Sequence, residues 1–102
     1  MGLNISLYRV IDMDSHQFTE DDRFDYIRYV GDVEFASFMN ENGKAIFCSH
    51  QFCCDWIFKR PVDFEQTREW IRANIVEENQ KRLLGVVDLM ESEKDLWLYF
   101  GW

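Results

Sequence analysis

The sequence DLWLYFGW, residues 95–102, alternates two sets of side chains along its length. One set comprises Leu96, Leu98, Phe100 and Trp102, and the other comprises Trp97, Tyr99 and Gly101. A period of two is typical of a β-strand, because successive side chains in a strand point to opposite faces of the sheet. We therefore predict a strand over residues 95–102.

Two other segments indicate strands. Residues 3–8, LNISLY, alternate apolar and polar side chains and predict a strand with one buried face. The apolar run WIF at residues 56–58 favours a strand over residues 55–59, ended by Pro61. The apolar residues earlier in the segment 44–60 fit a buried strand or a buried helix equally well.

Helical patterns lie between these strands. Asp63 and Gln66 have the spacing of a capping box and predict the start of a helix. Residues 77–90 predict a further helix, because their apolar side chains recur at helical spacing despite Gly85. Shorter helices are predicted at residues 23–30 and 33–40, and a solvated loop at residues 12–22.

Together these segments predict a small α+β domain that covers residues 1–102. The sheet should be antiparallel and include the N- and C-terminal strands, with the helices packed on one face. A chain of 102 residues is close to the commonest size of a single domain.

Composition narrows the class of function. The chain is 47% hydrophobic and 17% aromatic, which is too apolar for a disordered acidic tail. A formal net charge of −8 argues against direct binding to nucleic acid or to anionic membranes. The sequence contains no transmembrane-length apolar run and does not open with a signal peptide. Together with three cysteines, an odd number, this predicts a cytoplasmic protein.

Residues 12–34 concentrate the negative charge. Eight carboxylates there face only two arginines, so this segment carries −6 of the −8. Dense charge beside aromatic rings suggests a surface that binds a positively charged partner. The predicted partner-binding residues are Asp14, Phe18, Glu20, Asp21, Asp22, Asp25, Tyr26, Tyr29, Asp32 and Glu34. The alternative interpretation is that these acids serve solubility alone.

Cys48, His50, Cys53 and Cys54 are the candidate metal ligands, because thiolates and imidazole suit Zn²⁺. Their spacing matches no common zinc motif, and free cysteines are also ordinary core residues. The segment beginning at Asp12 lacks the glycine and the final glutamate of a calcium loop. We therefore expect no cofactor.

We also expect no enzymatic activity. Cys48 or Cys54 with His50 or His16 would supply a nucleophile and a base, but no third group that would orient them is identifiable. The sequence has no nucleophile elbow, P-loop or dinucleotide fingerprint.

The opening residues MGLNISLYRV, together with the aromatic strand LWLYFGW, resemble small bacteriophage and prophage proteins that begin Met-Gly-Leu-Asp. The similarity covers residues 1–10 and, in pattern only, residues 55–102. Asn4 stands where those proteins have Asp. The family has no assigned activity, so the resemblance carries over no functional residue. It implies a viral origin, in which small acidic domains bind and block host proteins.

The leading functional hypothesis is therefore a phage-type inhibitor of a host protein. The partner would be a nucleic-acid-handling defence effector such as a CRISPR complex, with carboxylates standing where phosphates normally lie. The alternative is a structural protein that self-associates, as a homodimer, through the edges of its terminal strands. A zinc-binding module is the third possibility.

Overall fold

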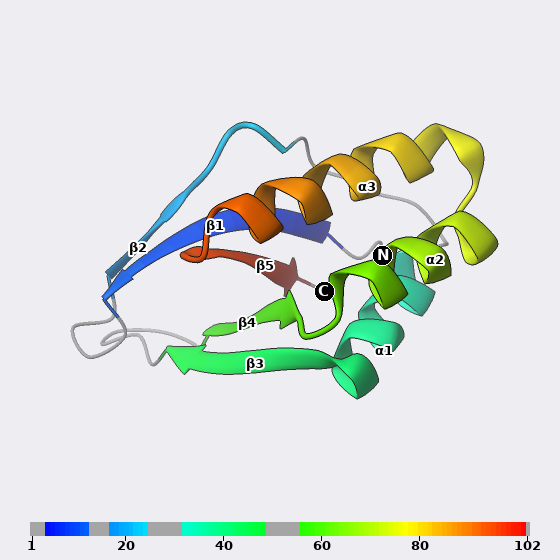
Figure 1. The fold of residues 1–102 in the computed structure, drawn as a ribbon. Coiled ribbons are helices and arrows are strands. Elements are labelled where there is room, and N and C mark those ends of the chain that lie inside the picture. The colour runs from blue at the N-terminus through cyan, green and yellow to red at the C-terminus, as the bar shows by residue number, and fades with distance from the viewer. Residues whose placement is uncertain (1–3, 13–16, 25–31, 49–55, 102) are drawn as a thin grey trace.

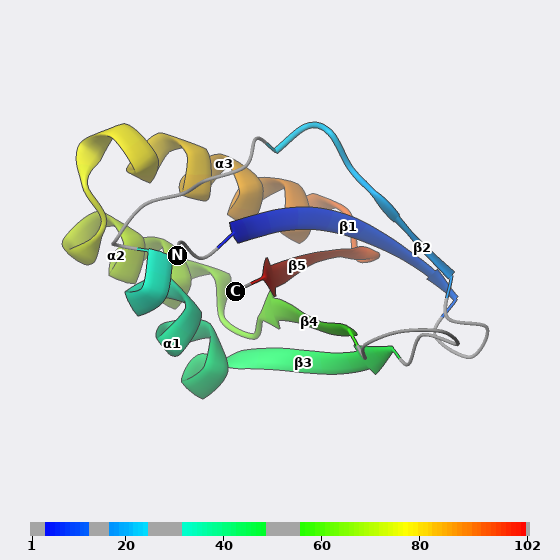
Figure 2. The same cartoon turned by 180° about the vertical axis from the view of Figure 1, so that it is seen from behind.

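The fold is an antiparallel sheet with helices on one face, as expected for an α+β domain. The computed structural model describes residues 4–12, 17–24, 32–48 and 56–101. Across these residues the chain forms five strands and three helices. In chain order they are β1 (Asn4–Asp12), β2 (Gln17–Glu20), α1 (Asp32–Asn42), β3 (Gly43–Cys48), β4 (Trp56–Pro61), α2 (Phe64–Asn74), α3 (Glu77–Ser92) and β5 (Leu96–Gly101). All the strand pairs are antiparallel, in the order β2-β1-β5-β4-β3. The helices gather on one side of the sheet (Figures 1 and 2).

The first and last strands pair directly in the middle of the sheet. Leu7 of β1 lies opposite Leu98 of β5, and Tyr8 lies opposite Trp97. The alternation of side chains therefore divides the sheet into two faces. Leu7 and Leu98 are fully buried in the main core with the helices, whereas Trp97 belongs to a smaller cluster on the opposite face. The prediction that the terminal strands belong to one antiparallel sheet is confirmed.

The main core fills the space between the sheet and the helices. Its largest fully buried side chains include Phe35 of α1, Ile71 of α2 and Leu83 and Met90 of α3. The predicted cap of α2 is confirmed, because the Asp63 carboxylate accepts a hydrogen bond of 3.0 Å from the Gln66 backbone N–H. Each helix thus turns one apolar stripe toward the sheet and leaves its charged side chains outside.

Arg60 of β4 closes the C-terminal end of α3. None of the last-turn residues of α3 is basic, and Arg60 donates instead to the carbonyl oxygens of Met90, Glu93 and Leu96. These carbonyls include groups left without an intrahelical partner, so a guanidinium is well suited to them. Burial lowers the pKa of Arg60 from its usual value. The interaction ties the sheet to the end of the helix.

The predicted loop over residues 12–22 is wrong in part, because residues 17–20 form strand β2 and β1 extends to Asp12. Phe18 explains the difference. Its ring packs edge-on against Tyr8 and Phe58, with centroids 5.7 and 5.0 Å apart. Three of the four residues of β2 are exposed, so their polar composition suggested a loop. Pairing with β1 and burial of one ring outweigh that composition.

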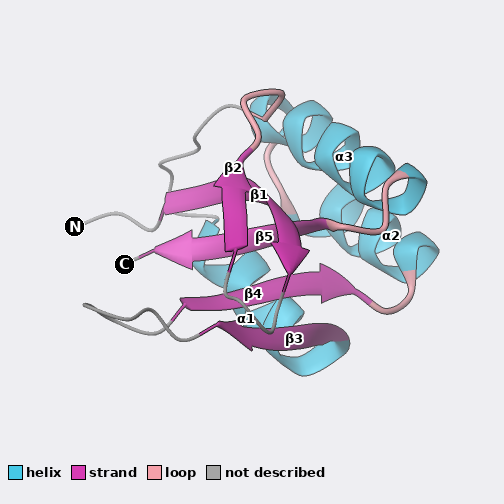
Figure 3. Ribbon diagram, turned by 90° about the vertical axis from the view of Figure 1, so that its left-hand side faces the viewer, coloured by secondary structure: helices cyan, strands magenta, loops and turns pink. Residues whose placement is uncertain are grey.

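The sheet curls so that β2 lies over its helix-free face. In Figure 3, β2 passes in front of β1 and β5. The pairing register shifts between Val10 and Asp12, which is an irregularity of the kind that bends a strand. The curl encloses a second cluster formed by Tyr8, Val10, Phe18, Ile46, Phe58, Trp97 and Tyr99.

One further expectation needs correction, and another falls mostly outside the described residues. The terminal strands were expected to supply free edges for self-association, but β1 and β5 are both internal. The open edges of the described sheet belong to β2 and β3. Of the helix expected at residues 23–30, only Arg23 and Phe24 lie in the described part of the chain, and they fall in a turn and a bend.

Candidate functional site

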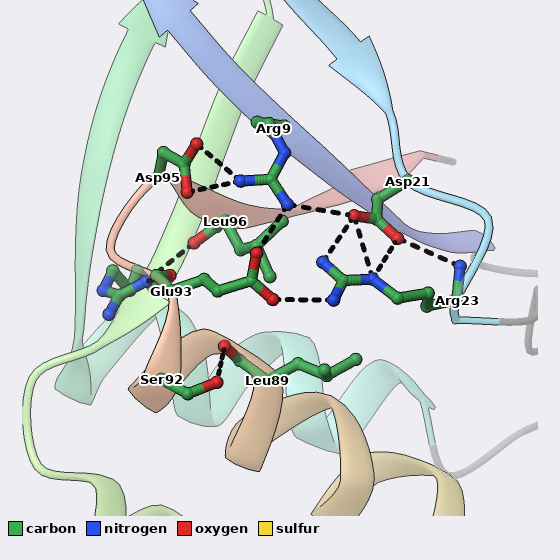
Figure 4. A network of polar contacts seen from close by, with 9 residues as sticks. Arg9, Asp21, Arg23, Leu89, Ser92, Glu93, Asp95 and Leu96 are labelled. Carbon is green, nitrogen blue, oxygen red and sulfur yellow. Dashed lines mark hydrogen bonds and ion pairs between the residues drawn. The ribbon is translucent and has the colours of Figure 1, made fainter.

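A network of charged side chains surrounds the C-terminal end of α3. It joins Arg9 of β1, Asp21 and Arg23 of the turn after β2, and Glu93 and Asp95 of the connection between α3 and β5. In Figure 4 these side chains point toward one another from the separate segments. The backbone brings the segments together, because the Val10 N–H donates to the Asp95 carbonyl at 2.9 Å and the Asp21 N–H donates to the Leu7 carbonyl at 2.8 Å.

Arg9 bridges the two carboxylates of the α3–β5 connection. Its Nη1 lies 2.7 and 2.6 Å from the two carboxylate oxygens of Asp95, and its Nη2 lies 2.7 Å from Glu93 Oε1. A longer contact of 3.5 Å joins Nη2 to Asp21. The pKa of Arg9 is raised, first by the hydrogen bond to Glu93 and then by that to Asp95. Arg9 therefore stays charged and fixes the positions of its acidic neighbours.

Arg23 holds Asp21 and Glu93 from the other side. Its Nε and Nη2 lie 2.9 and 2.8 Å from Asp21 oxygens, and its Nη1 lies 2.7 Å from Glu93 Oε2. The Arg23 backbone N–H also donates to Asp21 at 3.0 Å. These hydrogen bonds from Arg23 lower the pKa of Asp21 to about 2 and, with Arg9, lower the pKa of Glu93. Because the Asp21 side chain is only 10% exposed, its charge interacts mainly with the arginines of this network.

A second ion-pair cluster lies between α2 and α3. Arg68 of α2 lies 2.9 Å from Asp88, also pairs with Glu91, and lies 3.8 Å from Glu65. One guanidinium thus stands among three exposed carboxylates. The pKa of Arg68 is raised, chiefly by its hydrogen bond to Glu91. This cluster and the Arg9 network flank the last turn of α3, because Glu91 and Glu93 are two residues apart.

We call this region the acidic face. Its carboxylates are Asp21, Asp22, Glu65, Asp88, Glu91, Glu93 and Asp95. Among the described residues, five cations lie in the same region, namely Arg9, Arg23, Arg60, Arg68 and Lys94. Seven carboxylates against five cations leave a formal charge of −2. Four of the five cations, all arginines, bind carboxylates or backbone carbonyls of the same chain.

The chemistry of this face is that of a rigid anionic surface. Its arginines hold several carboxylates in fixed positions, while Asp22 is exposed beside the network. Ordered carboxylates accept charge-assisted hydrogen bonds from Arg and Lys side chains of another molecule. Because they are held in advance, less conformational entropy is lost when a partner binds.

The residues predicted to bind a partner do not all meet on this face. Asp21 and Asp22 lie on it, at the β2 side of the sheet. Glu20 does not, because it lies opposite Tyr8 in the pairing of β1 with β2 and therefore shares the helix-free face with the Tyr8 ring. Glu34 is exposed on α1, which packs against β3 and β4 at the other side of the sheet. Asp32 begins the same helix. The acids that lie close together in the sequence therefore separate in the fold.

Phe18 is a core residue of the second cluster rather than a free anchor, since its ring contacts Tyr8 and Phe58. The remaining predicted residues, Asp14, Asp25, Tyr26 and Tyr29, lie outside the described residues.

The candidate metal and catalytic residues lie largely outside the described part of the chain. Cys48 ends β3, while His16, His50, Cys53 and Cys54 fall in segments that the structure does not describe. Among the residues described, no group of three or more His, Cys, Asp or Glu side chains has the arrangement of a metal site.

No local pattern predicts that Glu93 and Asp95 belong with Asp21. They resemble the other scattered acids of the C-terminal half. The signal that would have placed them is the pairing of the terminal strands, because Arg9 lies opposite Leu96, the residue after Asp95. A basic residue in β1 beside the acidic start of β5 therefore predicts an ion pair once the two strands are aligned.

Within the described residues, no helix combines the length and the apolar composition that a membrane span requires. Neither a family model, nor a curated protein, nor a solved structure matches this chain.

Proposed function

We propose that this protein binds a basic surface of another protein through its acidic face and inhibits that protein by covering the surface. The observation that carries the proposal is the arrangement around the end of α3. Carboxylates from four separate segments outnumber the cations there and are held in place by arginines. A surface of this kind complements Lys and Arg side chains that normally contact phosphates.

The kind of partner follows from the resemblance to phage proteins. A phage protein that blocks a phosphate-binding surface would act on a nucleic-acid-handling host protein, and we propose a defence effector of the CRISPR type. The net charge of −8 supports this mode of action, since it favours encounter with a basic protein and disfavours direct binding to nucleic acid.

Charge reversal on the acidic face is the direct test. The variant Asp22→Lys changes one exposed residue and leaves the ion-pair network intact. A matched control, Glu34→Lys, makes the same change in net charge on α1. Asp21 is unsuitable for this purpose, because its reversal would also disrupt the contacts with Arg9 and Arg23.

The assay measures competition with labelled target DNA for a panel of purified guide-loaded CRISPR effector complexes. We expect the wild-type protein to displace DNA from at least one effector and the Asp22→Lys variant to require an about fivefold higher concentration. The control variant should stay within about twofold of wild type, and binding should weaken as salt rises. Equal losses in both variants would mean that net charge, rather than the acidic face, governs binding. Displacement that is insensitive to salt would contradict the phosphate-mimic mechanism.

A further inference from the structure

Strand β3 forms an open edge of the described sheet. It is last in the strand order and pairs only with β4, so one row of its backbone N–H and C=O groups faces outward. Figures 1 and 3 show β3 at the border of the sheet, away from α2 and α3. The opposite edge, β2, is shorter and curls over the sheet, which protects an edge from further pairing.

The open edge is rigid along its length. All six residues of β3 pair in register with β4, from Gly43 opposite Pro61 to Cys48 opposite Trp56. Gly43 lets α1 and β4 approach closely, because a Cβ at this position would lie 2.5 Å from the Met39 carbonyl oxygen. The Asn42 side chain donates to the Phe38 carbonyl and closes the end of α1 immediately before the strand. An edge that is already ordered loses little entropy when another strand joins it.

The side chains of this edge carry positive charge in an otherwise acidic chain. Lys44 and Ala45 are exposed, and Ile46 is half-buried against the second cluster. Lys59 of β4 lies opposite Ala45 and is half-buried. Among the described residues, neither Lys44 nor Lys59 takes part in an ion pair of 4 Å or less. Two cations that form no ion pair with a described residue favour a negatively charged neighbour.

We propose that the outer edge of β3 is a strand-addition site for an extended acidic segment of a partner protein. The segment would pair with the backbone of β3 and place a carboxylate beside Lys44. Two positions along, on the same face, it would place an apolar side chain beside Ile46, since side chains alternate between faces. A second copy of this chain would bind less favourably at this edge, because the Lys44 and Lys59 charges of the two copies would lie close together and repel one another. This site is independent of the acidic face and lies at the other side of the sheet.

The test uses two synthetic peptides and the ¹⁵N-labelled protein. Each peptide has eight residues that alternate valine and threonine, with one central valine replaced by glutamate in the first peptide and by lysine in the second, so that the charged residue has valine on either side of it on the same face. We expect the glutamate peptide to shift the amide signals of residues 44–46 and of the facing residues of β4. The lysine peptide should bind about two- to fivefold more weakly, the effect of one cross-strand charge pair.

The variant Lys44→Glu should reverse the preference, and Lys44→Gln should remove it. A control variant, Lys81→Glu on α3, makes the same charge change away from the edge and should leave the preference unchanged. Equal binding of both peptides, no binding at several millimolar, or shifts confined to β2 and the acidic face would overturn the proposal. Light scattering that shows a dimer, together with loss of the dimer in Lys44→Glu, would assign the edge to a second copy and would also overturn it. None of these outcomes bears on the DNA-competition assay.

Discussion

The rings of Phe18 and Phe58 lie 5.0 Å apart although their strands, β2 and β4, are separated in the sheet by β1 and β5. A flat sheet would hold these residues three strand spacings apart, or about 14 Å. The contact therefore measures how strongly the sheet curls. The curl covers Phe58 completely and gives the helix-free face a small core of its own.

Replacing Phe18 by Ala should destabilise the protein by about 1–3 kcal/mol, less than a fully buried Phe because Phe18 is half-exposed. The free energy of unfolding in urea measures the loss, and near-UV circular dichroism should report loosening of the surrounding rings. Thr19→Ala, on the exposed side of the same strand, should change stability by less than about 0.5 kcal/mol. Equal effects of the two substitutions would show that Phe18 contributes no packing.

Gly85→Ala should stabilise the protein by about 0.5–1 kcal/mol. Gly85 is exposed within α3, and a Cβ there would meet no atom within 4 Å. Alanine favours a helix interior because its unfolded chain has less conformational freedom. Thermal unfolding should show a rise of a few degrees in Tm. Gly43→Ala is the opposite case and should lower Tm, because its Cβ would collide with the Met39 carbonyl.

The stability of the protein should fall as pH drops from about 5 toward 2. Hydrogen bonds from Arg23 lower the pKa of Asp21 to about 2 in the folded chain, while the unfolded carboxyl has its ordinary, higher pKa. In this range the unfolded state therefore binds more protons, and stability is lost as pH falls. Asp21→Asn should cost about 1–2 kcal/mol at pH 7 and flatten the pH dependence. Urea unfolding from pH 2 to pH 7 tests this, and parallel profiles for the two proteins would contradict it.

Arg60→Met should destabilise the protein by about 1.5–3 kcal/mol, since it removes hydrogen bonds from a charged donor to the Met90, Glu93 and Leu96 carbonyls. The loss should concentrate at the end of α3, where amide hydrogen exchange would accelerate. Arg60→Lys keeps the charge, but a lysine cannot reach three carbonyls at once. The stability of this variant should therefore lie between those of the wild type and Arg60→Met. Uniform acceleration across the whole helix would contradict a local capping role.

Local patterns predicted the elements whose side chains follow one clear period. The alternation in residues 3–8 and 95–102 identified both central strands, and Asp63 with Gln66 identified the start of α2. Strand β2 was missed because its exposed residues resemble a loop and its single buried ring finds partners on strands distant in sequence. Such contacts exist only once the sheet has curled, and no local period reports them.

In the candidate site, too, local patterns predicted some residues, whereas others depend on contacts between segments distant in sequence. Asp21 and Asp22 were recognised from the density of charge around them, whereas Glu20, grouped with them, shares the other face of the sheet with Tyr8. Glu93 and Asp95 were not recognised, because Arg9 joins them to Asp21 only through pairing of β1 with β5. In the reverse direction, Glu34 was grouped with these acids by its sequence position, yet the fold places it on α1 against β3 and β4.

The pairing of Leu7 with Leu98 also constrains when the protein folds during its synthesis. Until residues 96–101 have been synthesised, the sheet lacks β5, and Ile5 and Leu7 of β1 stay uncovered. Closing a contact between residues as distant in sequence as Leu7 and Leu98 slows folding and lengthens the exposure to aggregation. Truncation from the C-terminal side should therefore abolish the fold outright rather than trim it.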